Sequence, residues 1–133
     1  MIYYGDEVGM KGGDDPDCRR CMIWDEEKQD RELYAYYKKL IGLRHKFQSL
    51  RRGTYRPIII DEIKNSFGFI RSHEEEYTVV ILNNSHVPQE YVLEGELLVD
   101  KGEIKDYLNG QSFRLKDSRY RIEVPAYGGV ILN

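Results

Sequence analysis

The stretch Arg119-Tyr120-Arg121-Ile122-Glu123-Val124 alternates charged and apolar side chains at every step. In an extended chain this alternation places Tyr120, Ile122 and Val124 on one face and the charged residues on the other, which predicts a half-buried β-strand. Further candidate strands, not all of them alternating, occur throughout the chain beyond about residue 50. They lie at residues 56–60, 66–72, 77–82, 90–93, 97–100, 104–107, 112–115 and 129–132. Short strands at this spacing predict an antiparallel β-sandwich.

Three turn signals separate these strands. Asn109-Gly110 is the strongest of them and predicts a two-residue type I′ hairpin that joins residues 106–108 to 112–115. The longest like-charge run, Glu74-Glu75-Glu76, predicts a solvated hairpin tip, and Asn83-Asn84 predicts the next turn.

The first fifty residues have a different pattern. Ile2-Tyr3-Tyr4, ended by Gly5, predicts the end of a buried strand, and residues 5–28 form a long loop rich in Gly, Asp and Pro. A helix is predicted over residues 30–47, because apolar residues recur there at spacings of three and four. These residues are Leu33, Tyr36, Tyr37, Leu40, Ile41 and Phe47. Strand, loop and helix together make one βα unit, so we expect a division between residues 1–50 and 51–133.

Composition excludes several classes of function. The 133 residues have a net charge of −3 and interspersed charges, which gives little support to nucleic-acid binding. The apolar N-terminal run is too short for a signal peptide or a membrane span, so we expect a cytoplasmic protein without a membrane partner. Cys18 and Cys21 form a C-x-x-C motif within the loop, and no histidine lies close to them. A structural zinc site needs four ligands, so we expect reduced thiols, no metal and no cofactor.

Residues 2–10, Ile2-Tyr3-Tyr4-Gly5-Asp6-Glu7-Val8-Gly9-Met10, resemble the end of the eighth barrel strand of the α-amylase family of glycoside hydrolases. Residues 12–24, from Gly-Gly-Asp-Asp-Pro to Met-Ile-Trp, are similar to the neopullulanase, cyclomaltodextrinase and maltogenic amylase branch of that family. Residues 40–44 resemble its last barrel helix, residues 50–53 the exit into its C-terminal domain, and residues 125–128 its ending.

This resemblance implies that residues 1–50 are a remnant of a (β/α)₈ barrel, consisting of strand 8, its βα-loop and helix 8. Residues 51–133 would be the Greek-key β-sandwich that follows the barrel. The loop would then lie on the catalytic face of the barrel. Asp15 and Arg19 match sugar-contacting residues of the family in the intact enzyme. The alternative is that Asp15 begins a turn at Pro16 and that Arg19 only pairs with it.

The resemblance also implies that no catalytic residue lies in this chain. Retaining glycosidases use two carboxyl groups about 5 Å apart, and in this family they come from barrel strands upstream of the eighth. Ser72-His73-Glu74 is similar to a third catalytic motif only superficially, because Glu replaces Asp and the segment lies in the β half. Asp6-Glu7 is expected to hold the base of the loop.

We therefore expect the C-terminal portion of an α-glucan-hydrolysing enzyme for cyclodextrins, pullulan or maltooligosaccharides, which is not catalytic alone and stabilises a missing upstream barrel. We also expect self-association through the barrel-facing surface. The alternative is an autonomous carbohydrate-binding module, which would show an exposed aromatic platform. The single tryptophan, Trp24, lies in the loop half, where we expect it and Tyr3-Tyr4 to be anchors rather than sugar-stacking groups.

Overall fold

The computed structural model describes residues 1–98 and 101–133, and the chain forms two compact units, Met1–Gly42 and Leu43–Asn133. The division precedes residue 50 because the segment after Gly42 packs on the β unit. Phe47 is 4% exposed and meets Tyr107 edge to face with ring centroids 4.8 Å apart. Ser49 is fully buried, and its Oγ lies 2.7 Å from Oγ1 of Thr78.

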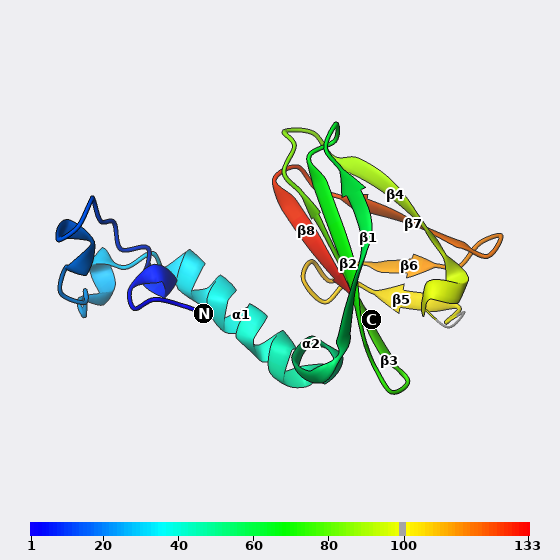
Figure 1. Ribbon diagram of the computed structural model, residues 1–133, viewed down its shortest axis with the longest axis horizontal. Coiled ribbons are helices and arrows are strands. Elements are labelled where there is room, and N and C mark those ends of the chain that lie inside the picture. The colour runs from blue at the N-terminus through cyan, green and yellow to red at the C-terminus, as the bar shows by residue number, and fades with distance from the viewer. Residues whose placement is uncertain (99–100) are drawn as a thin grey trace. The chain divides into compact units, whose positions relative to one another are not determined.

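The second unit consists of antiparallel strands in two layers (Figure 1). One layer is a four-stranded sheet in the order β1-β2-β3-β8. Its strands are β1 (Thr54–Asp61), β2 (Ser66–His73), β3 (Glu76–Asn83) and β8 (Gly128–Leu132). The remaining strands form two antiparallel pairs, β4 (Gln89–Glu94) with β7 (Arg119–Val124) and β5 (Glu103–Lys105) with β6 (Ser112–Arg114). The chain leaves the four-stranded sheet after β3 and returns to pair β8 with β3, which gives the expected sandwich.

The core lies between these layers. Tyr120, Ile122 and Val124 of β7 are all fully buried, so the alternation that predicted this strand also predicted its inward face. Side chains from both layers complete the cluster. They are Ile70, Val79, Ile81, Tyr91, Leu93, Leu98, Ile104, Val130 and Leu132. Burial of so many large apolar side chains is the main source of stability for this unit.

The type I′ hairpin predicted at Asn109-Gly110 is wrong. Of these two residues only Gly110 has a positive φ, 83°, whereas a type I′ turn needs positive φ at both central positions. The segment is instead a longer loop closed by Gly110 N to Asp106 O at 2.8 Å and by Asp106 N to Gln111 O at 2.8 Å. The carboxylate of Asp106, fully buried, organises this loop by accepting from the backbone N–H of Leu108 at 2.9 Å.

A turn of the primed type occurs elsewhere, at Asp117 and Ser118, with φ of 51° and 59°. Lys116 and Arg119 flank it and exchange two backbone hydrogen bonds of 2.9 Å. Of the predicted tip Glu74-Glu75-Glu76, Glu74 and Glu75 form the turn. Glu76 instead begins β3 opposite His73, and its Oε1 accepts from Ser49 N at 2.6 Å.

The strand predicted at residues 97–100 is also wrong within the described residues. Gly95–Leu98 forms a 3₁₀ helix, η4, and residues 99–100 lie outside the described part of the chain. Leu98 is fully buried and therefore anchors this turn in the core rather than extending a sheet.

In the first unit, the predicted strand at residues 2–4 is not formed. No other strand lies within Met1–Gly42 to pair with it, and the backbone turns instead, with Asp6 N donating to Tyr3 O at 3.1 Å. Three 3₁₀ helices follow along the loop. They are η1 (Asp6–Val8), η2 (Asp17–Arg19) and η3 (Glu26–Lys28).

The predicted helix is confirmed as α1 (Arg31–Lys46), and α2 (Ser49–Arg52) follows it. The Asp30 carboxylate caps α1 by accepting from Leu33 N at 2.9 Å. Of the apolar residues of α1 only Leu43 is buried, at 8% exposure, whereas Tyr36 and Ile41 are 46% and 44% exposed. The apolar stripe of the helix is thus half-buried at Leu33, Tyr37 and Leu40 and exposed at Tyr36 and Ile41.

Candidate functional site

The loop of the first unit begins with two glycines in left-handed conformation, Gly5 at φ 96° and Gly9 at φ 70°. They allow η1 to turn tightly between them. The side chains of η1 then fix the loop base, because Glu7 Oε2 accepts from Gly5 N and Asp6 Oδ2 accepts from Tyr3 N, both at 3.0 Å. The structural role expected of Asp6-Glu7 is confirmed by these bonds.

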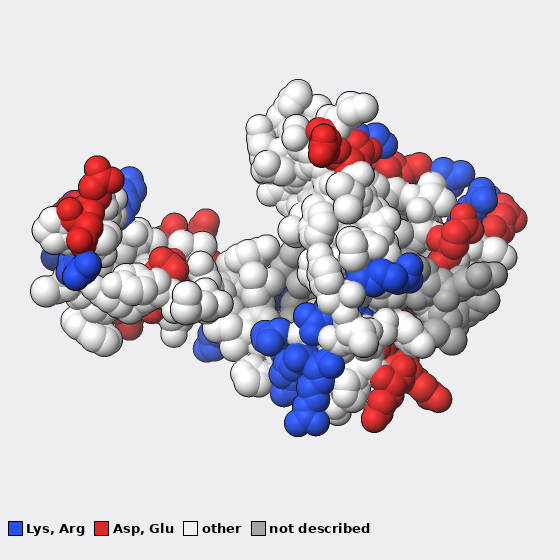
Figure 2. All heavy atoms as spheres, in the orientation of Figure 1, with Lys and Arg blue, Asp and Glu red and all other residues white. Residues whose placement is uncertain are grey.

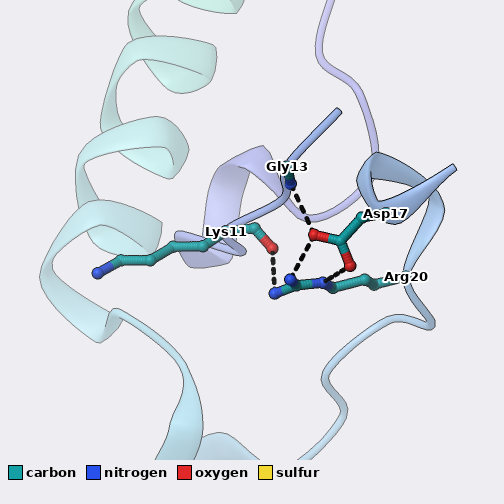
Figure 3. Close-up of polar contacts among 4 residues, drawn as sticks. All are labelled: Lys11, Gly13, Asp17 and Arg20. Atoms are coloured by element: carbon teal, nitrogen blue, oxygen red, sulfur yellow. Dashed lines mark hydrogen bonds and ion pairs between the residues drawn. The ribbon is translucent and has the colours of Figure 1, made fainter. Parts of the chain in front are cut away.

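Asp17 organises the middle of the loop (Figure 3). Its Oδ2 accepts from Gly13 N at 2.8 Å, and its Oδ1 accepts from Nε of Arg20 at 2.7 Å. Arg20 reaches further and donates from Nη1 to the carbonyl of Lys11 at 3.0 Å. One carboxylate and one guanidinium therefore connect three parts of the loop that lie up to nine residues apart.

The hydrogen bonds from Arg20 lower the pKa of the Asp17 carboxyl below its ordinary value, and those from Gly13 act in the same direction. The same pairing raises the pKa of the Arg20 guanidinium. Both groups therefore stay charged at neutral pH, and the framework of the loop is held by a charge-assisted fork.

Asp15 and Arg19, the predicted sugar contacts, lie beside this framework. Arg19 Nε is 2.8 Å from Asp15 Oδ1, and the two side chains are 68% and 62% exposed. The peptide bond from Asp15 to Pro16 is cis, and the Cys18 thiol also contacts Asp15 Oδ1, at 3.7 Å. The pairing considered as the alternative is thus present, and both side chains still offer free polar atoms to solvent. Sugar contact by these residues stays a prediction.

A hollow of about 280 Å³ lies on the same loop and is lined by Tyr4, Met10, Gly12, Cys18 and Arg20, among others. Tyr4 donates its hydroxyl to the Arg20 carbonyl at 2.9 Å. Desolvation and the neighbouring Tyr3 raise the pKa of the Tyr4 phenol above its ordinary value. Tyr4 is thus the anchor that we expected.

Trp24 differs from this expectation, because its side chain is 82% exposed and does not anchor the loop.

The sequence analysis missed Asp17 and Arg20. Their spacing of three residues across a short 3₁₀ helix was the available signal, since side chains at this spacing lie on the same side of such a turn. The family resemblance pointed to Asp15 and Arg19 instead, because those two residues match its sugar-contacting positions.

The rejected Ser72-His73-Glu74 motif lies at the end of β2, where Glu74 occupies the hairpin tip with φ 54°. Among the described residues, no three His, Cys, Asp or Glu side chains gather in a way that could hold a metal ion. Cys18 and Cys21 are both free and exposed.

Both signs of charge occur on the face shown in Figure 2, where one group of basic side chains lies at the lower middle and acidic side chains lie beside and above it. On β7, Arg119 pairs with Glu94 and Arg121 with Glu90, each at 3.1 Å between nitrogen and oxygen. These arginines are therefore neutralised across the strands rather than free for an anionic partner. In the described parts of the chain, no helix combines the length and apolar character needed to cross a bilayer.

Comparison with known proteins defines first the class of fold and then the family. The structure superposes on the crystal structure of an Anoxybacillus α-amylase with a TM-score of 0.86, 37% identity and coverage of 98% of this chain and 27% of that one. It superposes on the α-amylase of Geobacillus thermoleovorans with acarbose at a TM-score of 0.87 and 29% identity, over 98% of this chain and 28% of that one. The antiparallel β unit is thus an amylase-type C-terminal domain.

Residues 60–131 match the model of the maltogenic amylase C-terminal domain, and the chain belongs to that family. It is 40% identical to neopullulanase 2 of Thermoactinomyces vulgaris over 132 residues, which cover 99% of this chain and 22% of that protein. It is 37% identical to the cyclomaltodextrinase of Geobacillus thermopakistaniensis over 134 residues, 98% of this chain and 22% of that protein. The chain thus spans about a fifth of the length of these relatives.

Proposed function

We propose that this chain acts as the C-terminal portion of an α-glucan-hydrolysing enzyme whose substrates are cyclodextrins, pullulan or maltooligosaccharides. The observation that carries this proposal is the match of 99% of the chain to only 22% of a neopullulanase. On its own, the chain would not hydrolyse glucans, since the reaction needs two carboxyl groups facing one glycosidic bond. Its two adjacent candidates, Asp6 and Glu7, are both engaged in holding the loop base.

In this proposal residues 1–50 complete the catalytic barrel and residues 51–133 form the domain that packs on it and stabilises it. Residues 2–4 would become a strand only between neighbouring barrel strands, because an isolated segment has no partners for its backbone N–H and C=O groups. The apolar stripe of α1 would be covered by the same barrel. Tyr36 and Ile41, exposed in this chain, are the residues that gain most from such burial.

Asp15 and Arg19 would contact sugar hydroxyls in the assembled enzyme. Their exposure supports this role, as does the loop framework that Asp17 and Arg20 provide directly beside them. A carboxylate accepts hydrogen bonds from hydroxyl groups, and a guanidinium donates several in a fixed plane, so the pair suits a polyhydroxylated ligand.

A chimera tests the proposal. This chain would replace the matching 22% of the Geobacillus thermopakistaniensis cyclomaltodextrinase, and we expect the product to hydrolyse cyclodextrins. Arg19→Ala in the chimera should lower kcat/KM. The loss should correspond to about 1–3 kcal/mol of transition-state stabilisation, the range for removing a charge-assisted hydrogen bond. Arg121→Ala, another exposed and paired arginine, is the matched control and should leave the kinetics unchanged. A soluble chimera with no activity would contradict the proposal, and equal kinetics for Arg19→Ala would exclude its sugar contact.

One observation favours the second candidate, a carbohydrate-binding module. Tyr55, Phe69 and Phe67 form an aromatic row on β1 and β2, with ring centroids 5.4 Å apart for the first pair and 6.0 Å for the second. Tyr55 is 55% and Phe67 36% exposed, so part of this row is open to a ligand. Titration of residues 43–133 with maltoheptaose would measure sugar binding to this row. Binding that is lost in Tyr55→Ala would favour a carbohydrate-binding module.

A further inference from the structure

The two cysteines of the loop lie on either side of a change in backbone direction. Cys18 belongs to the 3₁₀ helix η2, and the chain leaves that helix at Arg20, which is extended with φ −63° and ψ 155°. Cys21 follows directly. Both thiols are free and exposed, so both are accessible to a reagent in solution.

Tyr4 fixes the end of this turn that precedes Cys21. Its hydroxyl donates to the carbonyl of Arg20, the residue that immediately precedes Cys21, at 2.9 Å. Cys18 and Tyr4 both line the same hollow. Cys18 and Tyr4 therefore lie together at this hollow, and Cys21 directly follows the residue that Tyr4 holds.

The framework around the turn restricts where the cysteines can move. A side chain at Gly12 would meet Cα of Cys18 at 2.9 Å, so the backbone of Gly12 packs directly on Cys18. Arg20, between the cysteines, is fixed by Asp17 and by the carbonyl of Lys11. Because only two residues separate the cysteines in the chain, their thiols meet each other more readily than either meets a thiol of another chain.

We propose that Cys18 and Cys21 are a modification site, at which a low-molecular-weight disulfide such as glutathione disulfide converts them into a reversible intramolecular disulfide. The thiolate of one cysteine attacks the glutathione disulfide, forms a mixed disulfide and releases one glutathione thiolate. The thiolate of the other cysteine attacks the protein sulfur of the mixed disulfide and releases the second glutathione. Two protein thiols are oxidised, and one glutathione disulfide is reduced to two glutathione molecules.

Oxidation changes the surroundings of the candidate sugar contacts. The Cys18 thiol contacts Asp15 Oδ1 at 3.7 Å in the reduced form, and a disulfide sulfur has no hydrogen to donate there. The inference itself does not rest on the proposed function, because the modification is measured on the 133-residue chain without any activity.

Tryptic mapping tests it sharply, because trypsin cleaves after Arg19 and Arg20, between the two cysteines. After treatment with glutathione disulfide, we expect peptides 12–19 and 21–28 to remain joined under non-reducing conditions and to separate on reduction. The intact oxidised chain should be monomeric in mass and carry no glutathione. Cys18→Ser and Cys21→Ser are the matched controls, and each should retain one glutathione because its mixed disulfide cannot be resolved. Two glutathione adducts on the unaltered chain, or peptides joined only between chains, would overturn the inference.

Discussion

At the scale of the residue, the loop depends on one ion pair, that of Asp17 with Arg20. The pKa of Asp17 is lowered in the folded chain, so the ion pair stabilises the loop above the ordinary pKa of an aspartate. This contribution is lost as the pH falls through the lowered value. We expect an NMR titration to give Asp17 a pKa below that of unfolded aspartate, and Arg20→Gln to return it to the ordinary range. Arg19→Gln is the control and should leave Asp17 unaffected, because Arg19 pairs with Asp15. An ordinary pKa for Asp17 in the unaltered chain would show that the Asp17–Arg20 ion pair does not form in solution.

In the β unit, the carboxylate of Asp106 organises a loop, as that of Asp17 does in the first unit. The fully buried carboxylate of Asp106 accepts from the backbone N–H groups of Leu108, at 2.9 Å, and Ile131, at 3.0 Å, and from Asn109. Asp106→Ala leaves these donors without their acceptor, and we expect the free energy of unfolding to fall by about 3 kcal/mol. Urea denaturation measures it. Glu123→Ala, at an exposed position of β7, should change it by less than about 0.5 kcal/mol. Equal effects of the two substitutions would show that Asp106 has no special role.

At the scale of the element, β7 contributes the central side chains of the core. Ile122 is fully buried, whereas Val92 on the paired strand β4 is 47% exposed. We expect Ile122→Ala to lower the free energy of unfolding by roughly 2–5 kcal/mol, since it leaves a cavity in a closely packed core. Val92→Ala should cost less than about 1 kcal/mol in the same denaturation experiment. A smaller loss at Ile122 than at Val92 would contradict the assignment of the inward face.

Elements with a strong periodic pattern could be predicted from the sequence, and those that depend on distant partners could not. The alternation of β7 and the spacing of α1 are local properties, so both elements were placed within a residue or two. Ile2-Tyr3-Tyr4 has the composition of a strand, but strand formation needs a neighbour that the first unit does not provide. Asn109-Gly110 has the composition of a tight turn, but Asp106 offers its buried carboxylate to the loop and stabilises a longer one.

The candidate site, too, could be predicted from the sequence only in part. Asp15 and Arg19 were found by their likeness to a family motif, and the sequence could not decide between a sugar contact and their mutual ion pair. Asp17 and Arg20 are of the same residue types and lie in the same loop. Their role depends on Gly13 N and the Lys11 carbonyl, which only the folded loop brings within hydrogen-bonding distance.

At the scale of the whole molecule, exposed apolar side chains predict self-association. Ile2, Tyr3, Tyr36 and Ile41 are each more than two-fifths exposed. Burying a large apolar side chain contributes roughly 1.5–3 kcal/mol, so several together suffice to drive association. We expect sedimentation velocity to show dimers or larger species at micromolar concentration.

Charge substitutions on α1 check this prediction. Tyr36→Lys combined with Ile41→Lys should shift the chain towards monomer, because two charges would have to be buried. Lys38→Glu, at an exposed position of the same helix, should leave the association unchanged. A strictly monomeric chain before any substitution would refute the prediction.

The most direct test of the central claim is a hydrolysis assay on the purified 133-residue chain with cyclodextrins, pullulan and starch. We expect no release of reducing sugar above that of the buffer, whereas the chimera should release it under the same conditions. Reproducible turnover that survives repurification and disappears in Asp15→Ala or Glu7→Ala would instead place the catalytic carboxylates within this chain.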